Sequence, residues 1–224
     1  MPRHARGFDA EAAFAHLCKR DRKLGAWMRR LGPIEADPRW RRSFDPVDAL
    51  ARAILYQQLS GKAAATIVGR VEAAIGSARF HCDTLARCDD ASIRSCGVSG
   101  NKLLALRDLS RREAAGEIPD LRRMSLMHQD EIVEALVPIR GIGRWTVEMM
   151  LMSRLGRPDV LPVDDLGIRK GAQIIDKLDA MPSPKALALR GEHWAPYRSY
   201  ASFYLWRIAD SAAAAARPNT RSQD

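Results

Sequence analysis

The chain has 224 residues, of which 46% are hydrophobic and 28% charged, and its formal net charge is +9. This length allows one large or two small domains and is ample for a buried core. The positive charge favours a polyanionic partner or surface, although ribosomal, membrane-surface and merely basic proteins share it. The N-terminus is charged and nowhere do about eighteen apolar residues run together, so we expect neither a signal peptide nor a membrane span.

The four cysteines show no paired spacing that would indicate a disulfide framework or a metal site. Cys18, Cys82, Cys88 and Cys96 contain no C-x-x-C pair, and we therefore expect free thiols in a reducing compartment. His81 stands beside Cys82 and could suggest a metal, but a fourth ligand at a sensible spacing is missing. We expect core thiols there, and no metal.

Helical patterns begin near the N-terminus. Residues 9–31 carry apolar side chains near helical spacing until a Gly-Pro pair ends the pattern. Asp45 is suited to cap a helix whose first residue is Pro46, and the apolar residues that follow have the spacing of one buried face. This helix is expected to end near residues 56–59, where Ser60 can cap the next helix.

The second half of the chain continues in the same way. Residues 97–119 open with a turn and continue as an amphipathic helix, and residues 126–137 supply a further helix. The closing segment, residues 193–210, has apolar and aromatic residues that suit a buried helix face. No run that alternates with a period of two is longer than about four residues. We therefore predict an all-α protein.

Residues 136–170 are the most informative stretch. An apolar helix end leads to a tight turn with Gly141 and Gly143, a second helix, and a loop that delivers Asp164 and Asp165 to the start of a third helix. Glycines let a backbone approach another molecule closely because they lack a Cβ atom. A helix start presents N–H groups that form an anion site. In a basic protein the obvious long anion is a nucleic-acid backbone.

This stretch resembles a known family. The run LVPIRGIGRWT is similar to the helix-hairpin-helix of base-excision DNA glycosylases, the HhH-GPD superfamily, and VLPVDDLGIRKG is similar to its loop and catalytic aspartate. A Trp directly after G-I-G-R resembles the 3-methyladenine DNA glycosylase II branch. The resemblance, over roughly residues 44–210, implies a base-excision repair enzyme. Such an enzyme flips alkylated purines, of the 3-methyladenine and 7-methylguanine type, out of DNA and hydrolyses their N-glycosidic bond.

The resemblance implies that the hairpin, at about residues 127–155, grips a DNA phosphate. The residues expected to contact DNA are Arg140, Gly141, Gly143, Arg144, Thr146 and, from another helix start, Lys102. A solvated side chain is the alternative for Lys102, and a packing role is the alternative for the glycine turn. The hairpin carbonyls are expected to be able to hold a monovalent cation. No other cofactor is expected, and no iron–sulfur cluster, because no cysteine follows Cys96.

Asp165 matches the catalytic aspartate of the family by its spacing from Trp145. Cleavage of an N-glycosidic bond builds positive charge on the sugar, and a fixed carboxylate stabilises that charge and orients or deprotonates the attacking water. Asp164 is expected to be a structural neighbour. The alternative, from local sequence alone, is that both carboxylates only cap the helix that follows.

The closing segment resembles the W-x-P-[WY]-R-S-Y-A segment of the family, in which a second Trp lines the base pocket. Trp206 has the matching spacing and is expected to be the principal pocket aromatic, with Trp145, Tyr204 and Tyr56 as further candidates. An electron-rich ring stacks on a cationic base more favourably than on a neutral one, by roughly 0.5–2 kcal/mol. The alternative is that these aromatic residues belong to the core.

The string ARAILYQQLSGKAAATI is similar to a second family segment, whose QQLS junction faces the damaged duplex. A side chain there can fill the hole left when a base leaves the stack. Gln57, Gln58 and Leu59 are the candidates. The alternative is that the two glutamines form hydrogen bonds with backbone at a helix junction.

The resemblance also implies two helical subdomains that flank a cleft, one of residues 46–163 and the other of residues 1–45 with 164–224. We expect no N-terminal β-rich domain, because few residues precede this match. Bifunctional relatives carry a lysine nucleophile where this chain has Trp145, so we expect a monofunctional hydrolase without lyase activity. The expected partner is double-stranded DNA that contains alkylated bases, bound by a monomer. The expected location is the cytoplasm with the nucleoid, or the nucleus in a eukaryote.

Two other functions remain open at this stage. The first is a non-catalytic helix-hairpin-helix module that only binds DNA, and Asp165 together with Trp206 argues against it because a binder needs neither. The second is a glycosylase for deaminated, etheno or oxidised bases. The missing lyase lysine and cluster cysteines argue against the closest relatives of that kind.

Overall fold

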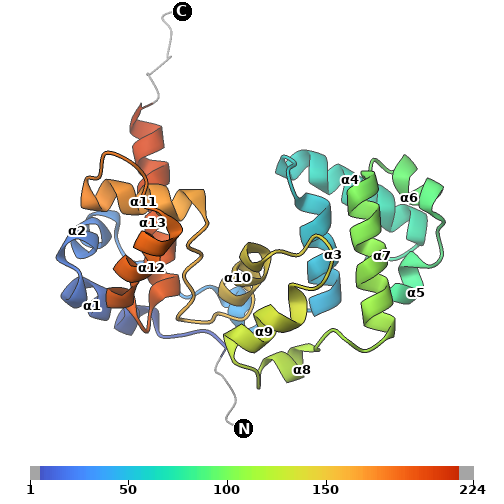
Figure 1. The fold of residues 1–224 in the computed structure, drawn as a ribbon, viewed down its shortest axis with the longest axis horizontal. Coiled ribbons are helices and arrows are strands. Elements are labelled where there is room, and N and C mark those ends of the chain that lie inside the picture. The colour runs from blue at the N-terminus through green and yellow to red at the C-terminus, as the bar shows by residue number, and fades with distance from the viewer. Residues whose placement is uncertain (1–5, 217–224) are drawn as a thin grey trace, which may run out of the picture. The chain divides into compact units, whose positions relative to one another are not determined.

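The computed structural model describes residues 6–216, and all regular structure within that range is helical (Figure 1), which confirms the all-α prediction. None of these helices is long and apolar enough to cross a membrane. The helices are α1 (Ala10–Arg20), α2 (Arg22–Leu31), η1 (Pro38–Arg41), α3 (Pro46–Tyr56), α4 (Gly61–Ile75), α5 (Cys82–Leu85), α6 (Asp90–Ser95), α7 (Gly100–Ala114), α8 (Leu121–Met124), α9 (Gln129–Leu136), α10 (Arg144–Ser153), α11 (Leu166–Asp176), α12 (Pro184–Gly191), η2 (Glu192–Trp194) and α13 (Arg198–Ala216).

The described chain divides into two compact units. One comprises residues 42–147 and the other residues 6–41 with 148–216. The first change of unit lies near the expected boundary at residue 46. The second falls inside α10 rather than at the expected residue 163. Just past the end of α10, the carbonyl of Leu155 accepts a hydrogen bond from the N–H of Gly7 at 3.3 Å, within the same unit. The predicted cleft stays a prediction.

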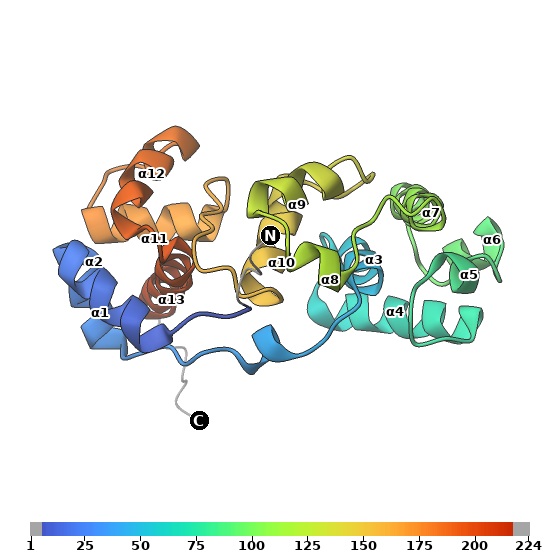
Figure 2. The same cartoon turned by 90° about the horizontal axis from the view of Figure 1, so that it is seen from below.

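The unit of residues 42–147 is built on α3, α4 and α7, and Figure 2 looks almost along α7 with α4 crossing below it. Asp45 accepts hydrogen bonds from the N–H groups of Val47 and Asp48 at 2.9 and 3.2 Å, so the predicted cap is confirmed. Ser60 caps α4, as predicted, through the N–H of Ala63. The apolar faces of these helices form the core, whose burial stabilises the unit by about 25 cal/mol per Å² of apolar surface.

The second unit packs α11 against α13, with α1 and α2 beside them. The helical pattern of residues 9–31 proves to be two helices that meet at Asp21. Asp21 is the C-cap of α1 and the N-cap of α2, and its Oδ1 accepts from the N–H groups of Lys23 and Leu24. Its Oδ2 accepts the indole N–H of Trp194 at 2.8 Å. Capping therefore interrupts a pattern whose apolar periodicity continues through the break.

Candidate active site and nucleic-acid interface

Asp165 stands at the start of α11 and is half-buried. Its Oδ1 accepts two hydrogen bonds, each of 2.8 Å, from the backbone N–H of Ile168 and from the indole Nε1–H of Trp206. Asp165 therefore does cap a helix, as the alternative had it, and is also held by a second helix, α13. Asp164 is exposed beside it. The carboxylate is fixed by groups from two packed elements.

Gly167 makes this arrangement possible, and the sequence prediction missed it. A Cβ atom at position 167 would lie 2.8 Å from Cδ1 of Trp206 and 3.2 Å from Oδ1 of Asp165. Both distances are shorter than ordinary van der Waals contact, so a side chain there would push the indole and the carboxylate apart. The sequence signal was present, because a glycine two residues after the aspartate lies in the first turn of the helix.

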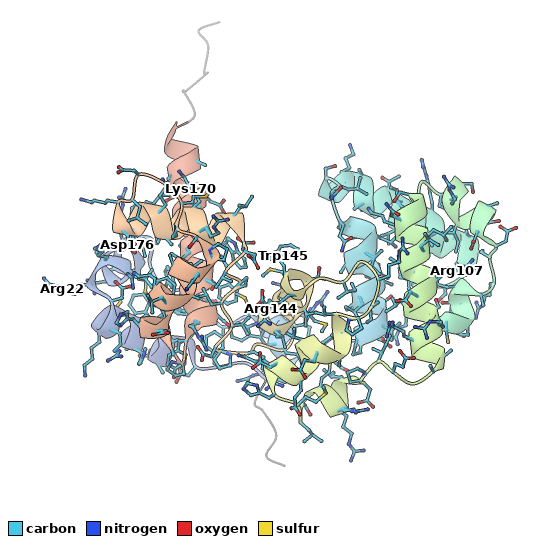
Figure 3. The ribbon with its side chains drawn as sticks, viewed as in Figure 1. Arg22, Arg107, Arg144, Trp145, Lys170 and Asp176 are labelled. Carbon is cyan, nitrogen blue, oxygen red and sulfur yellow. The ribbon has the colours of Figure 1, made fainter. Side chains whose placement is uncertain are left out.

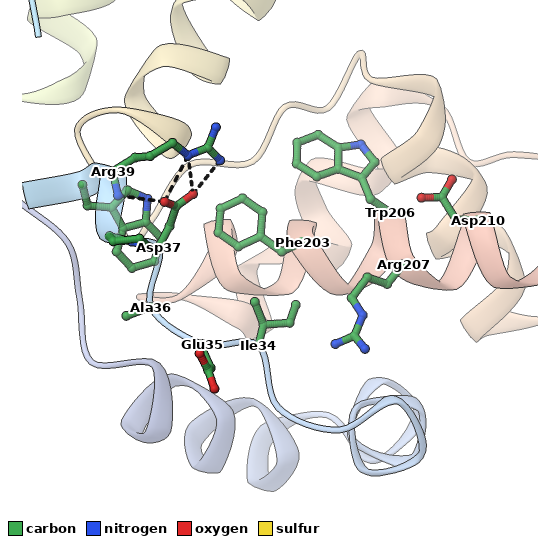
Figure 4. Close-up of a pocket in the computed structure, with 11 residues that line it drawn as sticks. Ile34, Glu35, Ala36, Asp37, Arg39, Phe203, Trp206, Arg207 and Asp210 are labelled. Atoms are coloured by element: carbon green, nitrogen blue, oxygen red, sulfur yellow. Dashed lines mark hydrogen bonds and ion pairs between the residues drawn. The ribbon is translucent and has the colours of Figure 1, made fainter. Parts of the chain in front are cut away.

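A pocket of about 460 Å³ lies beside Trp206 within the unit of residues 6–41 and 148–216 (Figure 4). Its aromatic wall is a row of rings: Trp206 and Phe203 have centroids 6.0 Å apart, and Phe203 stacks on Trp40 at 6.4 Å. At its edge Arg39 donates to both carboxylate oxygens of Asp37, and this hydrogen bond lowers the pKa of Asp37. The lining residues are Ile34, Glu35, Ala36, Asp37, Pro38, Arg39, Trp40, Phe203, Trp206, Arg207 and Asp210.

The other predicted pocket aromatics lie elsewhere. Tyr204 is fully buried, and its hydroxyl donates to the carbonyl of Gly32 at 2.9 Å. Burial raises the pKa of Tyr204, and its ring packs edge-on against Tyr200. Tyr204 is thus a core residue, and its prediction as a pocket residue is not supported. Tyr56 and Trp145 are 42% and 45% exposed and belong to the other unit, so their pocket roles stay predictions.

The hairpin has the predicted form, with α9 and α10 joined by a glycine turn. Gly141 has φ +78°, a left-handed conformation that glycine adopts without strain, and both Gly141 and Gly143 are exposed. Arg140 and Arg144 are exposed next to them, and Figure 3 labels Arg144 and Trp145 at the start of α10. The backbone N–H of Thr146 donates to the carbonyl of Gly143 at 3.0 Å, which begins the helix. The exposed turn fits the predicted phosphate contact, which stays a prediction.

Two of the residues predicted to face DNA also form hydrogen bonds within the protein. The Nζ ammonium of Lys102 donates to the carbonyl of Leu55 at 2.7 Å, and burial lowers the pKa of Lys102. The side-chain amide of Gln57 donates to the carbonyl of Gly141 at 2.8 Å. Lys102 is therefore not simply solvated, while its phosphate role stays a prediction. Gln57 follows its backbone-bonding alternative. Gln58 and Leu59 are exposed.

The His-Cys segment serves the structure of its unit. The two ring nitrogens of His81 lie 2.6 Å from Glu113 Oε1 and 3.2 Å from Asp45 Oδ2. Within residues 6–216 no three potential ligands lie close enough together to hold a metal ion. Cys82 and Cys88 are half-buried rather than core residues.

An all-helical chain with an exposed glycine hairpin, and a braced carboxylate at the next helix start, has the features of a helix-hairpin-helix protein. The chain belongs to the family described as HhH-GPD superfamily base excision DNA repair proteins, whose sequence model matches residues 51–196. The predicted membership of this superfamily is confirmed.

Relatives of known name agree with this membership. The chain is 36% identical over 166 residues to DNA-3-methyladenine glycosylase 1 of Schizosaccharomyces pombe, a match that covers 74% of this chain and 73% of that protein. It is similar, at 32% identity and a TM-score of 0.80, to the crystal structure of a DNA-3-methyladenine glycosidase from Bacillus halodurans, with 96% and 95% of the two chains covered. It is also similar to the Schizosaccharomyces pombe 3-methyladenine DNA glycosylase in complex with abasic DNA, at 32% identity and a TM-score of 0.75, with 88% and 95% covered.

Proposed function

We propose that this protein is a DNA glycosylase that acts on double-stranded DNA. It hydrolyses the N-glycosidic bond of alkylated purines of the 3-methyladenine type and leaves an abasic site. The similarity to relatives named as 3-methyladenine glycosylases supports the substrate class. The observation that carries the proposal is the 2.8 Å hydrogen bond between Trp206 and Asp165. It joins an aromatic ring suited to a flipped base directly to a carboxylate suited to its sugar.

In the proposed reaction the bond between C1′ of the sugar and the base nitrogen breaks. The electron pair of that bond leaves with the base, and a purine that is cationic through alkylation departs neutral, without prior protonation. Positive charge develops on the sugar, where the Asp165 carboxylate stabilises it. Water then adds to C1′ and gives up a proton to the carboxylate or to solvent. The products are a free base and an abasic sugar.

Trp206 supplies selectivity for cationic bases in this proposal. A flipped base is held by stacking and by contacts at its edges. The indole face attracts a cationic base more strongly than it attracts a neutral base of the same shape, by roughly 0.5–2 kcal/mol. Because the indole N–H donates to Asp165, the ring of Trp206 has a set orientation on α13.

The exposed turn around Gly141 and Gly143 provides the proposed grip on the DNA backbone. Backbone N–H groups at a helix start bind phosphate oxygens, and Arg140 and Arg144 add positive charge beside them. We further propose that the hairpin carbonyls hold a monovalent cation, that the protein acts as a monomer, and that it lacks lyase activity because Trp145 stands where a lysine nucleophile would be required.

The test measures release of free base from duplex DNA treated with a methylating agent. Asp165→Asn is the informative variant, because an asparagine keeps an oxygen that can accept from Ile168 and Trp206 while the carboxylate charge is lost. The parent should release 3-methyladenine and 7-methylguanine, and the variant should be slower by about 100-fold or more. Binding of both proteins to a duplex with an abasic site serves as the control for folding and DNA contact.

Retention of full base release by Asp165→Asn would show that the carboxylate is not the catalytic group. If both proteins bind abasic DNA and neither releases a methylated base, the glycosylase proposal fails for these lesions. The non-catalytic binding module would then be the better account.

A further inference from the structure

One side chain ties the turn between α3 and α4 to the hairpin. Gln57 follows the last residue of α3, and its Nε2 amide donates to the carbonyl oxygen of Gly141 at 2.8 Å. Both residues belong to the unit of residues 42–147. Gly141 is the left-handed glycine of the hairpin. The bond therefore links the turn that is expected to face the damaged base to the turn that is expected to hold a phosphate.

The residues directly after Gln57 form an exposed tip, which we define as Gln58 and Leu59. Gln58 has φ +56°, a conformation that a residue with a Cβ atom rarely adopts. Gln58 is exposed, and Leu59 is 40% exposed. Backbone strain of this kind persists only where the surrounding structure holds it, and it is frequent at functional sites.

Helix α7 holds both turns as well. The Nζ of Lys102 donates to the carbonyl of Leu55, in the last turn of α3, at 2.7 Å. Six residues further along α7, Oδ2 of Asp108 accepts the backbone N–H of Arg140, in the hairpin, at 2.9 Å. Both turns are therefore bonded to the same helix, α7. The side chain of Gln57 bonds the two turns directly to each other.

We propose that Gln57 is a positioning residue for base extrusion, which holds Gln58 at a fixed place relative to the phosphate grip so that Gln58 fills the gap left by the flipped base. The proposal rests on the proposed function, because only a protein that extrudes a base leaves a gap to fill. The amide of Gln58 can both donate to and accept from the edges of an unpaired base. The amide of Gln57 is already bonded inside the protein and holds the tip.

The first experiment compares the affinity of full-length variants for two duplexes, one with a stable abasic-site analogue and one undamaged. Gln57→Met keeps the length of the side chain and removes the donor. It should weaken binding to the abasic duplex by about three- to tenfold, as expected for one lost hydrogen bond, and binding to the undamaged duplex by less than about twofold.

A matched control is Gln173→Met. The amide of Gln173 also donates to backbone carbonyls, those of Leu178 and Asp179, but in the other unit. This variant should leave both affinities unchanged. Gln57→Lys restores a donor on a chain one bond longer and should recover part of the preference for the abasic duplex. It also provides a second test if Gln57→Met proves too unstable to measure.

The second experiment is a double-mutant cycle. Gln58→Ala should weaken binding to the abasic duplex by about the same three- to tenfold, and the double variant should bind no more weakly than the weaker single variant. Without the Gln58 side chain, positioning of the tip by Gln57 has no effect on binding. The losses of affinity in the two single variants should therefore not add.

Several results would overturn the proposal. Additive losses, equal losses on both duplexes, or no loss in Gln57→Met would show that the bond serves packing alone. Stronger coupling of Gln57 to Leu59→Ala than to Gln58→Ala would reject Gln58 as the gap-filling residue. Binding to the abasic analogue involves no bond cleavage, so these outcomes are separate from base release, which tests the glycosylase itself.

Discussion

The indole N–H of Trp206 donates a 2.8 Å hydrogen bond to the carboxylate of Asp165, 41 residues earlier in the chain. The same carboxylate oxygen accepts the backbone N–H of Ile168. Two donors on one oxygen hold the carboxylate in one orientation, and one of them comes from the ring proposed to stack on the base. Orientation of the carboxylate and position of the ring are therefore linked, and substitutions at either residue should affect both.

Trp206→Phe keeps an aromatic ring and removes the donor. We expect excision of methylated bases to slow by about ten- to hundredfold, since a misoriented catalytic group loses much of its effect, while binding to abasic DNA changes little. The matched control is Trp194→Phe, which removes an indole N–H from Asp21 at the same 2.8 Å distance in the core. That variant should lower the melting temperature and leave the rate per folded molecule unchanged. Equal slowing of excision in both variants would show that the hydrogen bond of Trp206 contributes only to stability.

Gly167→Ala places a Cβ atom 2.8 Å from Cδ1 of Trp206 and 3.2 Å from the carboxylate of Asp165. The indole must move to relieve this contact, so excision should slow by about tenfold or more. Gly69→Ala is the control, because a Cβ there meets nothing within 4 Å. Within the helix α4 it should stabilise the protein by up to about 1 kcal/mol and leave excision unchanged. Normal excision by Gly167→Ala would show that the site tolerates displacement of Trp206.

Local chemistry made the helix starts predictable. Asp45 and Ser60 cap the helices that follow them, because a short polar side chain satisfies N–H groups two or three residues ahead. The glycine turn of the hairpin was predictable for a similar reason. The break at Asp21 was not predictable, because the apolar spacing continues across it. The carboxylate is held there by Trp194 and Arg190, which are both distant in the sequence.

The candidate site was predictable only in part. Spacing indicated Asp165 and Trp206, but nothing in the sequence showed that one donates to the other or that Gly167 leaves room for the contact. Gln57 and Gly141 are 84 residues apart, and their bond depends on how the helices pack. Tyr204 shares the aromatic spacing of its neighbours, yet it lies on the face of α13 that is buried in the core. Periodicity identifies a face of a helix, and packing decides what that face meets.

Tyr204→Phe tests the assignment of this residue to the core. The variant loses the hydrogen bond from the hydroxyl to the carbonyl of Gly32. The free energy of unfolding should fall by about 0.5–1.5 kcal/mol, the usual contribution of one hydrogen bond, and excision of methylated bases should be unchanged. Urea unfolding and base release measure the two effects. Slower base release at an unchanged free energy of unfolding would indicate that Tyr204 contributes to the base pocket.

His81 should make the stability of the protein depend on pH. Burial lowers the pKa of His81, but the hydrogen bond to Glu113 and the charge of Asp45 raise it, and the net pKa is raised. A folded-state pKa above the unfolded value of about 6.5 means that the native protein binds more protons between the two values. The contribution is therefore fully present below the unfolded pKa and is lost as the pH rises through the folded pKa.

The test measures the free energy of unfolding in urea across the pH range that brackets these two pKa values. The parent should lose stability with rising pH in this window, and His81→Gln should lose that part of the dependence because it has no titrating ring. His193→Gln replaces an exposed histidine of the other unit and should leave the dependence in place. A parent and a His81→Gln variant with the same slope would mean that the ion pairs of His81 contribute nothing to stability in this pH range.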